Sequence, residues 1–103
     1  MNELPTRDDF LKHLNTKFRV FFDGQQPTEV ELTEVSELRQ KPQYEAFALV
    51  FRAPKTIPPM QMLYQVEHDA LGTMDLFLVP FEETENNFAF EALFNRKITA
   101  ASD

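Results

Sequence analysis

The sequence predicts a mostly β protein, built as a six-stranded antiparallel barrel-like or two-layer curled sheet with one short N-terminal helix. Apolar residues alternate with polar ones over most of the chain, which is the period of a strand. Short turn signals separate six such stretches, and no helical stretch lies between them. This periodicity predicts which face each strand buries, but it leaves open whether the first strand pairs with the last to close the sheet.

The helix is predicted over residues 6–14. Thr6 provides an N-cap with Asp9 three residues later, and Phe10, Leu11 and Leu14 follow at helical spacing. We expect a helix of this length to cover one end or one open face of the sheet.

The β-rich region is predicted over residues 17–95. A strand ending at Phe22, the turn signal Asp23-Gly24 and a second strand from Thr28 predict a hairpin. In the second strand the apolar phase slips by one residue near Thr33-Glu34, which predicts a β-bulge.

The middle of the chain predicts two more strands. Residues 44–52 are apolar on both faces and are expected to lie centrally, and the proline-rich residues 53–59 are expected to form a stiff connection. Residues 60–68 alternate cleanly, with one face formed by Met60, Met62, Tyr64, Val66 and His68. Gly72 then supplies a tight turn with a positive φ angle.

The last two strands are predicted over residues 73–81 and 88–94. The first is apolar on both faces, which favours the sheet interior, and it is expected to end near Pro80. The second places four residues inward, namely Phe88, Phe90, Ala92 and Phe94. The polar residues 96–103 are predicted to form a disordered tail. With one core, residues 1–103 are predicted to be a single domain.

Charge and composition exclude several classes of function. A net charge of −7 and a pI near 4.7 argue against binding to nucleic acid or to an anionic membrane. The chain has no cysteine, which removes disulfides and thiolate chemistry and fits a reducing compartment. Residues 1–10 do not have the pattern of a signal peptide, and the apolar run Leu76–Phe81 is too short to span a bilayer. We expect an acidic, soluble protein, cytoplasmic by default and not inserted in a membrane.

The few nucleophiles and histidines lack a catalytic pattern. Adjacent strand residues point to opposite faces, so His68 and Asp69 are interpreted as a half-buried histidine and a turn-capping aspartate. His13 has no metal-ligand partner at the usual spacing and is predicted to lie on the surface. Neither Ser36 nor Ser102 lies in a glycine-flanked elbow.

The carboxylates and glycines also lack the pattern of a site. Acidic residues cluster at Asp8-Asp9, Glu29 with Glu31, and residues 82–85, but none of these segments has the spacing of a calcium loop. The two glycines of the chain cannot build a phosphate-binding loop. We therefore predict no catalytic, cofactor-binding or metal-ligating residue, and no cofactor.

An apolar-ligand cavity is the main alternative to a plain core. The interior of a six-stranded barrel is only wide enough for side chains, so the core is favoured. If a cavity exists, its predicted lining is Met60, Met62, Met74, Phe47, Phe77, Phe88 and Phe90.

Most of the chain resembles a small bacterial family known as a domain of unknown function. The resemblance rests on Phe10 to Phe18, on Val30 to Val35, and on four motifs further along: residues 47–51 (FALVF) with Pro54; Leu63-Tyr64 with His68 and Leu71-Gly72; residues 76–80 (LFLVP); and residues 90–95 (FEALFN). It implies no catalytic residues. It also implies an accessory role in a surface or phage-tail-like assembly, because similar proteins are encoded near phage-tail-like collar proteins.

These observations predict a non-enzymatic protein-interaction or accessory structural module. Its partner would be another protein, bound through an exposed strand edge or through the helix-covered end, and homo-oligomers are possible through unprotected edges. One alternative is a small barrel that binds an apolar ligand. A second is an enzyme that uses a carboxylate and His68.

Overall fold

The computed structural model describes residues 5–22, 26–42 and 44–97. Its helix, α1, spans Arg7–Leu11. Its strands are β1 Lys17–Val20, β2 Thr28–Val35, β3 Arg39–Lys41, β4 Tyr44–Pro54, β5 Met62–His68, β6 Gly72–Glu83 and β7 Asn87–Lys97.

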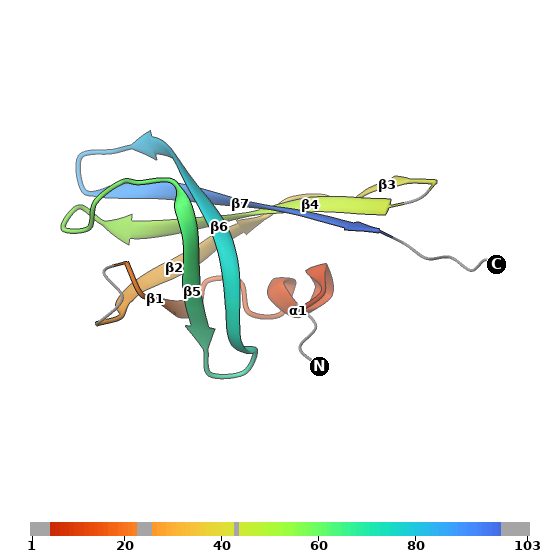
Figure 1. The fold of residues 1–103 in the computed structure, drawn as a ribbon, viewed down its shortest axis with the longest axis horizontal. Helices are drawn as coiled ribbons and strands as arrows, with labels where there is room; N and C mark the ends of the chain where they lie inside the picture. The colour runs from red at the N-terminus through yellow and green to blue at the C-terminus, as the bar shows by residue number, and fades with distance from the viewer. Residues whose placement is uncertain (1–4, 23–25, 43, 98–103) are drawn as a thin grey trace.

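Six of these strands form a closed antiparallel barrel (Figure 1). The sheet runs in the order β2-β1-β5-β6-β7-β4, and the additional pairing of β2 with β4 joins its two ends. The predicted fold class is confirmed, and of the two arrangements left open the barrel is the one observed. The predicted hairpin of the first two strands is present as β1 and β2, whereas its turn at Asp23-Gly24 lies outside the described residues.

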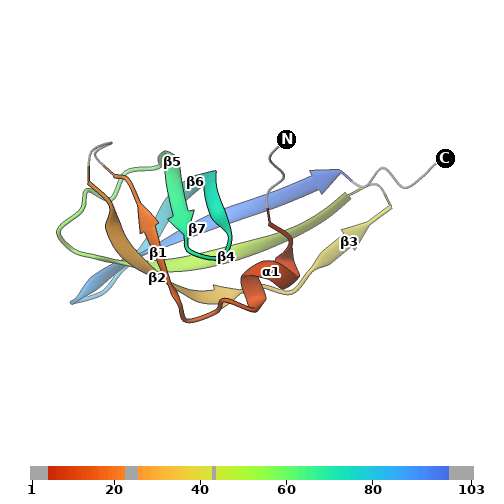
Figure 2. The ribbon, with the colours of Figure 1, turned by 90° about the horizontal axis from the view of Figure 1, so that it is seen from below.

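The strands β4 and β7 are longer than the barrel wall. They pair over eleven residue pairs, from Pro54 with Asn87 to Tyr44 with Lys97. Beyond the barrel they continue as an extension that also includes β3, which pairs with the start of β4. We call this extension the arm: β3, residues 44–48 of β4 and residues 93–97 of β7. It projects from the barrel in Figure 1, and Figure 2 shows α1 close to the arm on one side of it.

The core fills the barrel and continues under the arm. Inward side chains of β1, β2, β4, β5, β6 and β7 are buried, including Phe18, Leu32, Phe51, Val66, Leu78 and Phe90. Phe10 of α1 is fully buried, and its ring centroid lies 6.3 Å from that of Phe47 and 5.3 Å from that of Phe94. Because those two rings point from the inner face of the arm, α1 covers that face.

The helix is shorter than predicted. Thr6 is the N-cap, and it forms the expected capping box with Asp9, whose pKa is lowered by the hydrogen bond from the Thr6 backbone N–H. The predicted continuation to residue 14 is wrong, because α1 ends at Leu11. Asn15 adopts a left-handed φ of 67° and donates its backbone N–H to the Leu32 carbonyl at 2.7 Å. A hydrogen bond to β2 therefore replaces the last helical turn.

Two local features appear where the sequence predicts them. The pairing of β2 with β4 shifts register between Leu32 and Glu34, which is the expected bulge. Gly72 opens β6 with a φ of 84°, which is the conformation that the turn requires.

The strand ends differ from the prediction. β6 continues past Pro80 to Glu83, because a register shift between Pro80 and Glu82 absorbs a residue that cannot donate to the ladder. β7 includes residues 96 and 97, which were predicted as disordered tail, because their backbone pairs with Glu45 and Tyr44. Residues 98–103 lie outside the described part of the chain. β3 was not predicted, since its three polar residues carry no apolar alternation.

Candidate functional site

His68 lies at the end of β5 and is 7 % exposed. Its Nδ1 accepts hydrogen bonds from the backbone N–H groups of Ala70 at 3.0 Å and Leu71 at 3.3 Å. The histidine, rather than Asp69, therefore caps the turn. Asp69 points to solvent and binds the Arg19 guanidinium at 3.0 Å, and hydrogen bonds to Glu67 and Asp69 raise the pKa of Arg19.

The hydrogen bonds of His68 determine its tautomer. Because Nδ1 accepts two N–H groups, the proton of the neutral ring is on Nε2, which donates to the Thr16 hydroxyl at 3.0 Å. That hydroxyl donates to the His13 carbonyl at 2.6 Å. A general base needs a free nitrogen that faces the proton it removes. His68 has no such nitrogen in this arrangement, and its burial lowers its pKa, which keeps the ring neutral.

His13 lies beside His68, which its sequence position did not reveal. It follows α1 in a turn rather than lying on the helix, it is half-buried, and its ring centroid is 4.7 Å from that of His68. Among the described residues, no group of three or more histidine or carboxylate side chains could hold a metal ion. The pair is thus part of the packing at this end of the barrel.

Several acidic side chains predicted to be solvated form ion pairs between strands. Arg52 binds Glu82 at 3.5 Å and Lys55 binds Glu83. Lys17 lies 4.0 Å from Glu31 on the neighbouring strand. Such exposed pairs stabilise a fold by ~1 kcal/mol or less. The carboxylates in these ion pairs join neighbouring segments. They do not face one another across a cleft.

The proposed ligand-cavity lining is not assembled in the interior. Met60 precedes β5, and Met60, Met62 and Phe77 are all exposed, whereas the other four lining residues are buried. Phe77 points away from the core because it alternates with the buried Leu76 and Leu78 on β6. Inside the barrel the Phe18 and Phe51 rings meet at 5.2 Å and the Phe22 and Phe90 rings at 5.6 Å. These aromatic rings thus occupy interior space that a ligand cavity would need.

Exposed apolar side chains lie on the outer face of neighbouring strands of the sheet. Leu63 of β5 is opposite Phe77 of β6, and Leu93 of β7 is opposite Ala48 of β4. Phe77 and Leu93 are the residues next to Leu78 and Ala92, the last pair of the β6–β7 ladder. Leu63, Phe77 and Leu93 are 62 %, 49 % and 68 % exposed. We call Leu63, Phe77, Leu93 and Ala48 the apolar row.

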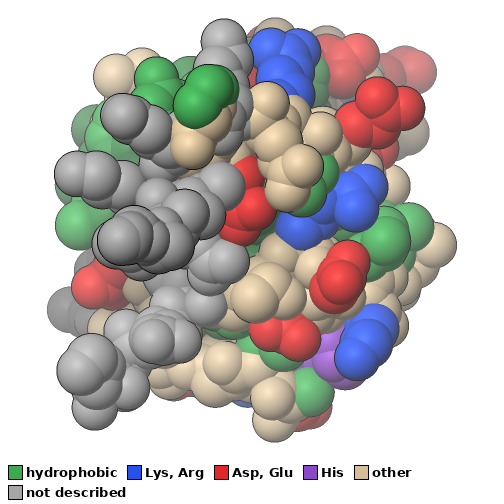
Figure 3. Space-filling model, turned by 90° about the vertical axis from the view of Figure 1, so that its right-hand side faces the viewer, with side chains coloured by type: hydrophobic (Ala, Val, Ile, Leu, Met, Phe, Trp, Pro, Cys, Tyr) green, Lys and Arg blue, Asp and Glu red, His purple; other side chains and the backbone are tan. Residues whose placement is uncertain are grey.

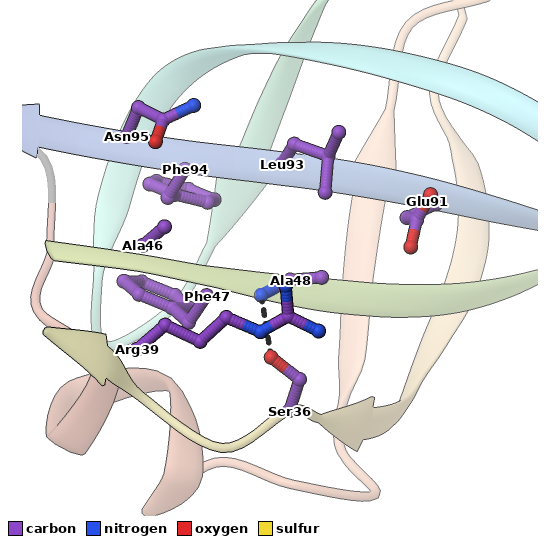
Figure 4. Close-up of a pocket in the computed structure, with 9 residues that line it drawn as sticks. All are labelled: Ser36, Arg39, Ala46, Phe47, Ala48, Glu91, Leu93, Phe94 and Asn95. Atoms are coloured by element: carbon purple, nitrogen blue, oxygen red, sulfur yellow. Dashed lines mark hydrogen bonds between the residues drawn. The ribbon is translucent and has the colours of Figure 1, made fainter.

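A groove of about 240 Å³ adjoins the end of this row (Figure 4). Ala46 and Ala48 form part of its lining, and their small side chains leave the hollow between β7 and the segment that joins β2 to β3. The remaining lining comes from Ser36, Arg39, Phe47, Glu91, Leu93, Phe94 and Asn95. Ordinary ligand pockets measure roughly 300–1,000 Å³. This groove is therefore closer in size to one large side chain than to a cofactor.

Ser36 lines the groove and lies between the end of β2 and the start of β3, where strand pairing with β4 is interrupted. Its backbone N–H donates to the Ala48 carbonyl at 2.8 Å, and its hydroxyl accepts from the Ala48 N–H at 2.8 Å. Arg7 of α1 donates to the Ser36 carbonyl at 2.6 Å. The side chain of Ser36 thus replaces a strand partner, and the gap between β2 and β3 is held in one position.

The groove carries one charge of each sign. Arg39 lies on the β3 side and Glu91 on β7, towards the barrel (Figure 4). In the described part of the chain neither side chain has a hydrogen-bond or ion-pair partner. Seen from the side to which the arm points, the surface mixes acidic, basic and hydrophobic side chains (Figure 3).

The outer edge of β7 borders the same surface. β6 pairs with β7 only up to Ala92, so residues 93–97 pair with β4 on one side, and the described chain provides no strand on the other. Neither the row nor the groove was predicted from the sequence. Their signal was the apolar residues on both faces of residues 73–81 and 44–52, which were interpreted as burial on both sides.

The chain matches a family model described as a domain of unknown function, DUF6916, over residues 5–94. This match confirms the resemblance to a domain family of unknown function. No curated protein and no solved structure matches the chain. None of the described helices is long and apolar enough to cross a membrane.

Proposed function

We propose that this chain, which belongs to the DUF6916 family, is a non-enzymatic module that binds another protein through the apolar row and the adjoining groove. The observation that supports this proposal most directly is the exposure of Leu63, Phe77 and Leu93 on the outer face of three neighbouring strands. Single exposed apolar residues are ordinary, but contiguous exposed patches are typical of interaction sites.

The surface also favours a protein partner over the two alternatives. The groove is small for an apolar ligand, and the aromatic rings of the interior pack against one another. The hydrogen bonds of His68 do not favour its use as a catalytic base. The net charge of −7 disfavours nucleic acid as a partner. We further propose a cytoplasmic location, which the lack of cysteine supports, and the family resemblance suggests an accessory role in a phage-tail-like or surface assembly.

The test is to compare what wild type and a Leu93→Arg variant retain when they are purified gently from the native host. Leu93 is mostly exposed, so the variant should fold with a stability within ~0.5 kcal/mol of wild type. Native mass spectrometry should show a stoichiometric protein partner with wild type and a loss of that partner of about tenfold or more with the variant.

The matched control is Leu11→Arg, which places the same charge on an exposed leucine of α1, on the other side of the arm. This control should retain the partner in the wild-type ratio. If Leu93→Arg retains the partner as well as the control does, the apolar row is not the binding surface and the proposal is wrong.

A further inference from the structure

We propose that the groove accepts an extended segment of the partner with a large apolar side chain at its centre, flanked by a basic residue beside Glu91 and an acidic residue beside Arg39. This inference rests on the proposed function and adds the chemistry of the partner. It follows from the size of the groove, from its two unpaired charges and from the position of the apolar row.

The size of the groove selects the central residue. About 240 Å³ is available between β7 and the segment that joins β2 to β3. Leu93, Ala46 and Ala48 supply apolar surface there. The groove is partly open to solvent, so a chain can pass over it while one side chain enters. A large apolar side chain fills such a space and removes Leu93, at 68 % exposure, from water.

The charges select the flanking residues. Glu91 is opposite Val50 near the barrel, whereas Arg39 belongs to β3, which pairs with Ala46 further out along the arm. The Arg39 side chain reaches back from there, so that its guanidinium lies near Ala48 and Ser36 (Figure 4). Neither Glu91 nor Arg39 has a partner within the described chain. A segment with a base on one side of its apolar residue and an acid on the other meets each charge with the opposite sign, whereas a segment with two charges of one sign meets one of them with a like charge.

A second copy of this chain is a poorer occupant. Each copy carries a net charge of −7, so two copies repel one another before any contact forms. A partner segment with its own basic residue does not meet this repulsion at Glu91. The segment of another protein is therefore the occupant to test first.

The experiment uses ¹⁵N-labelled full-length protein and three nine-residue peptides, each at about 1 mM to detect weak binding. Each peptide has a central phenylalanine. One has aspartate before it and lysine after it, the second has aspartate on both sides, and the third is uncharged. The amide signals of Ala46, Ala48 and Leu93 report occupation of the groove. We expect the peptide with aspartate and lysine to bind about fivefold more tightly than the peptide with two aspartates, because an attractive pair at Glu91 replaces a repulsive one.

A charge-reversed variant, Glu91→Lys, makes the test specific. It places two positive charges in the groove and should invert the preference in favour of the peptide with two aspartates. The matched control, Glu31→Lys, reverses a carboxylate elsewhere and should leave the preference unchanged.

Three outcomes overturn the inference. Equal binding of the two charged peptides shows that the groove does not select the charges that flank the apolar residue. The absence of any shift at the groove amides shows that no such segment enters it. Concentration-dependent shifts of these amides without peptide show that a second copy occupies the groove. In each case, loss of the native partner by Leu93→Arg would still support the proposed function, so the two failures are distinguishable.

Discussion

At the scale of single residues, His68 shows how tertiary contacts define the chemistry of a side chain. Its two nitrogens face Thr16 on one side and two backbone N–H groups on the other. The rings of Phe18 and His13 pack against it at 4.2 Å and 4.7 Å. A histidine that sequence reasoning considered as a catalytic candidate is therefore a buried cap of the turn between β5 and β6.

We predict that this histidine makes the fold less stable in acid. The pKa of His68 lies below its usual value of 6.5, chiefly because the side chain is buried. The nearby His13 and Arg19 also lower this pKa, whereas Asp69 raises it. The unfolded chain then binds a proton more readily than the folded one. The free energy of unfolding should be unaffected by His68 above pH 6.5, and it should fall as the pH decreases from 6.5 towards the lowered pKa. Urea denaturation at a series of pH values measures this slope.

The control for the pH prediction is His68→Asn. The amide oxygen can still accept from the N–H groups of Ala70 and Leu71, as in an Asx turn, but the residue no longer titrates. At neutral pH this variant should lose about 1 kcal/mol with the Thr16 hydrogen bond. Between pH 6.5 and 5 its stability should change less than that of wild type. An equal slope would assign the acid sensitivity to other groups.

At the scale of elements, the short helix acts as the cover of the arm. α1 has only five residues, which is far too short to be stable alone. Its position is maintained by the capping box at Thr6, by the hydrogen bond from Arg7 to Ser36, and by Phe10 between Phe18, Phe47 and Phe94. The helix and the inner face of the arm therefore depend on one another.

We predict that Phe10→Ala lowers the free energy of unfolding by about 3–5 kcal/mol, because a fully buried aromatic ring leaves a cavity. The neighbouring substitution Leu11→Ala removes an exposed side chain and should change stability by ~0.5 kcal/mol or less. Chemical denaturation of the two variants gives the comparison. A loss below ~1 kcal/mol for Phe10→Ala would mean that the arm is stable without its cover.

At the scale of the whole molecule, the ladders that join neighbouring strands of the barrel, here called seams, differ in length. β4 and β7 share eleven residue pairs, whereas β1 meets β5 in only two, Arg19 with Glu67 and Val20 with Val66. The short seam is extended by the hydrogen bond from Phe21 to the Gln65 carbonyl and by the ion pairs of Arg19.

We predict that the barrel opens first at this short seam. Native-state hydrogen exchange should show the strongest protection in the central residues of β4 and β7, and protection weaker by about tenfold or more in β1 and the facing part of β5. Substitution of Arg19 by Ala should accelerate exchange in β1 and leave the exchange of the β4 and β7 amides unchanged. Uniform protection around the ring would show that the barrel opens only by global unfolding.

The same scale explains which parts of the candidate site the sequence predicted. The inward faces of β5 and β7 followed from alternation, as the burial of Tyr64 and Phe90 shows. Alternation could not show that the other face of β6 is open, because an apolar residue such as Phe77 has the same pattern whether a neighbouring layer covers it or not. The exposure that motivates the proposed function was therefore invisible in the sequence.

The sequence by itself determined the features that depend on neighbouring residues. These are the N-cap at Thr6, the bulge after Leu32, the positive φ of Gly72 and the inward faces of β5 and β7. The tertiary structure decided the closure of the barrel, the early end of α1, the arm with β3, and the tautomer of His68. Each of these depends on hydrogen bonds or packing between residues far apart in the chain, such as Asn15 with Leu32 or β2 with β4, and local periodicity carries no information about such pairs.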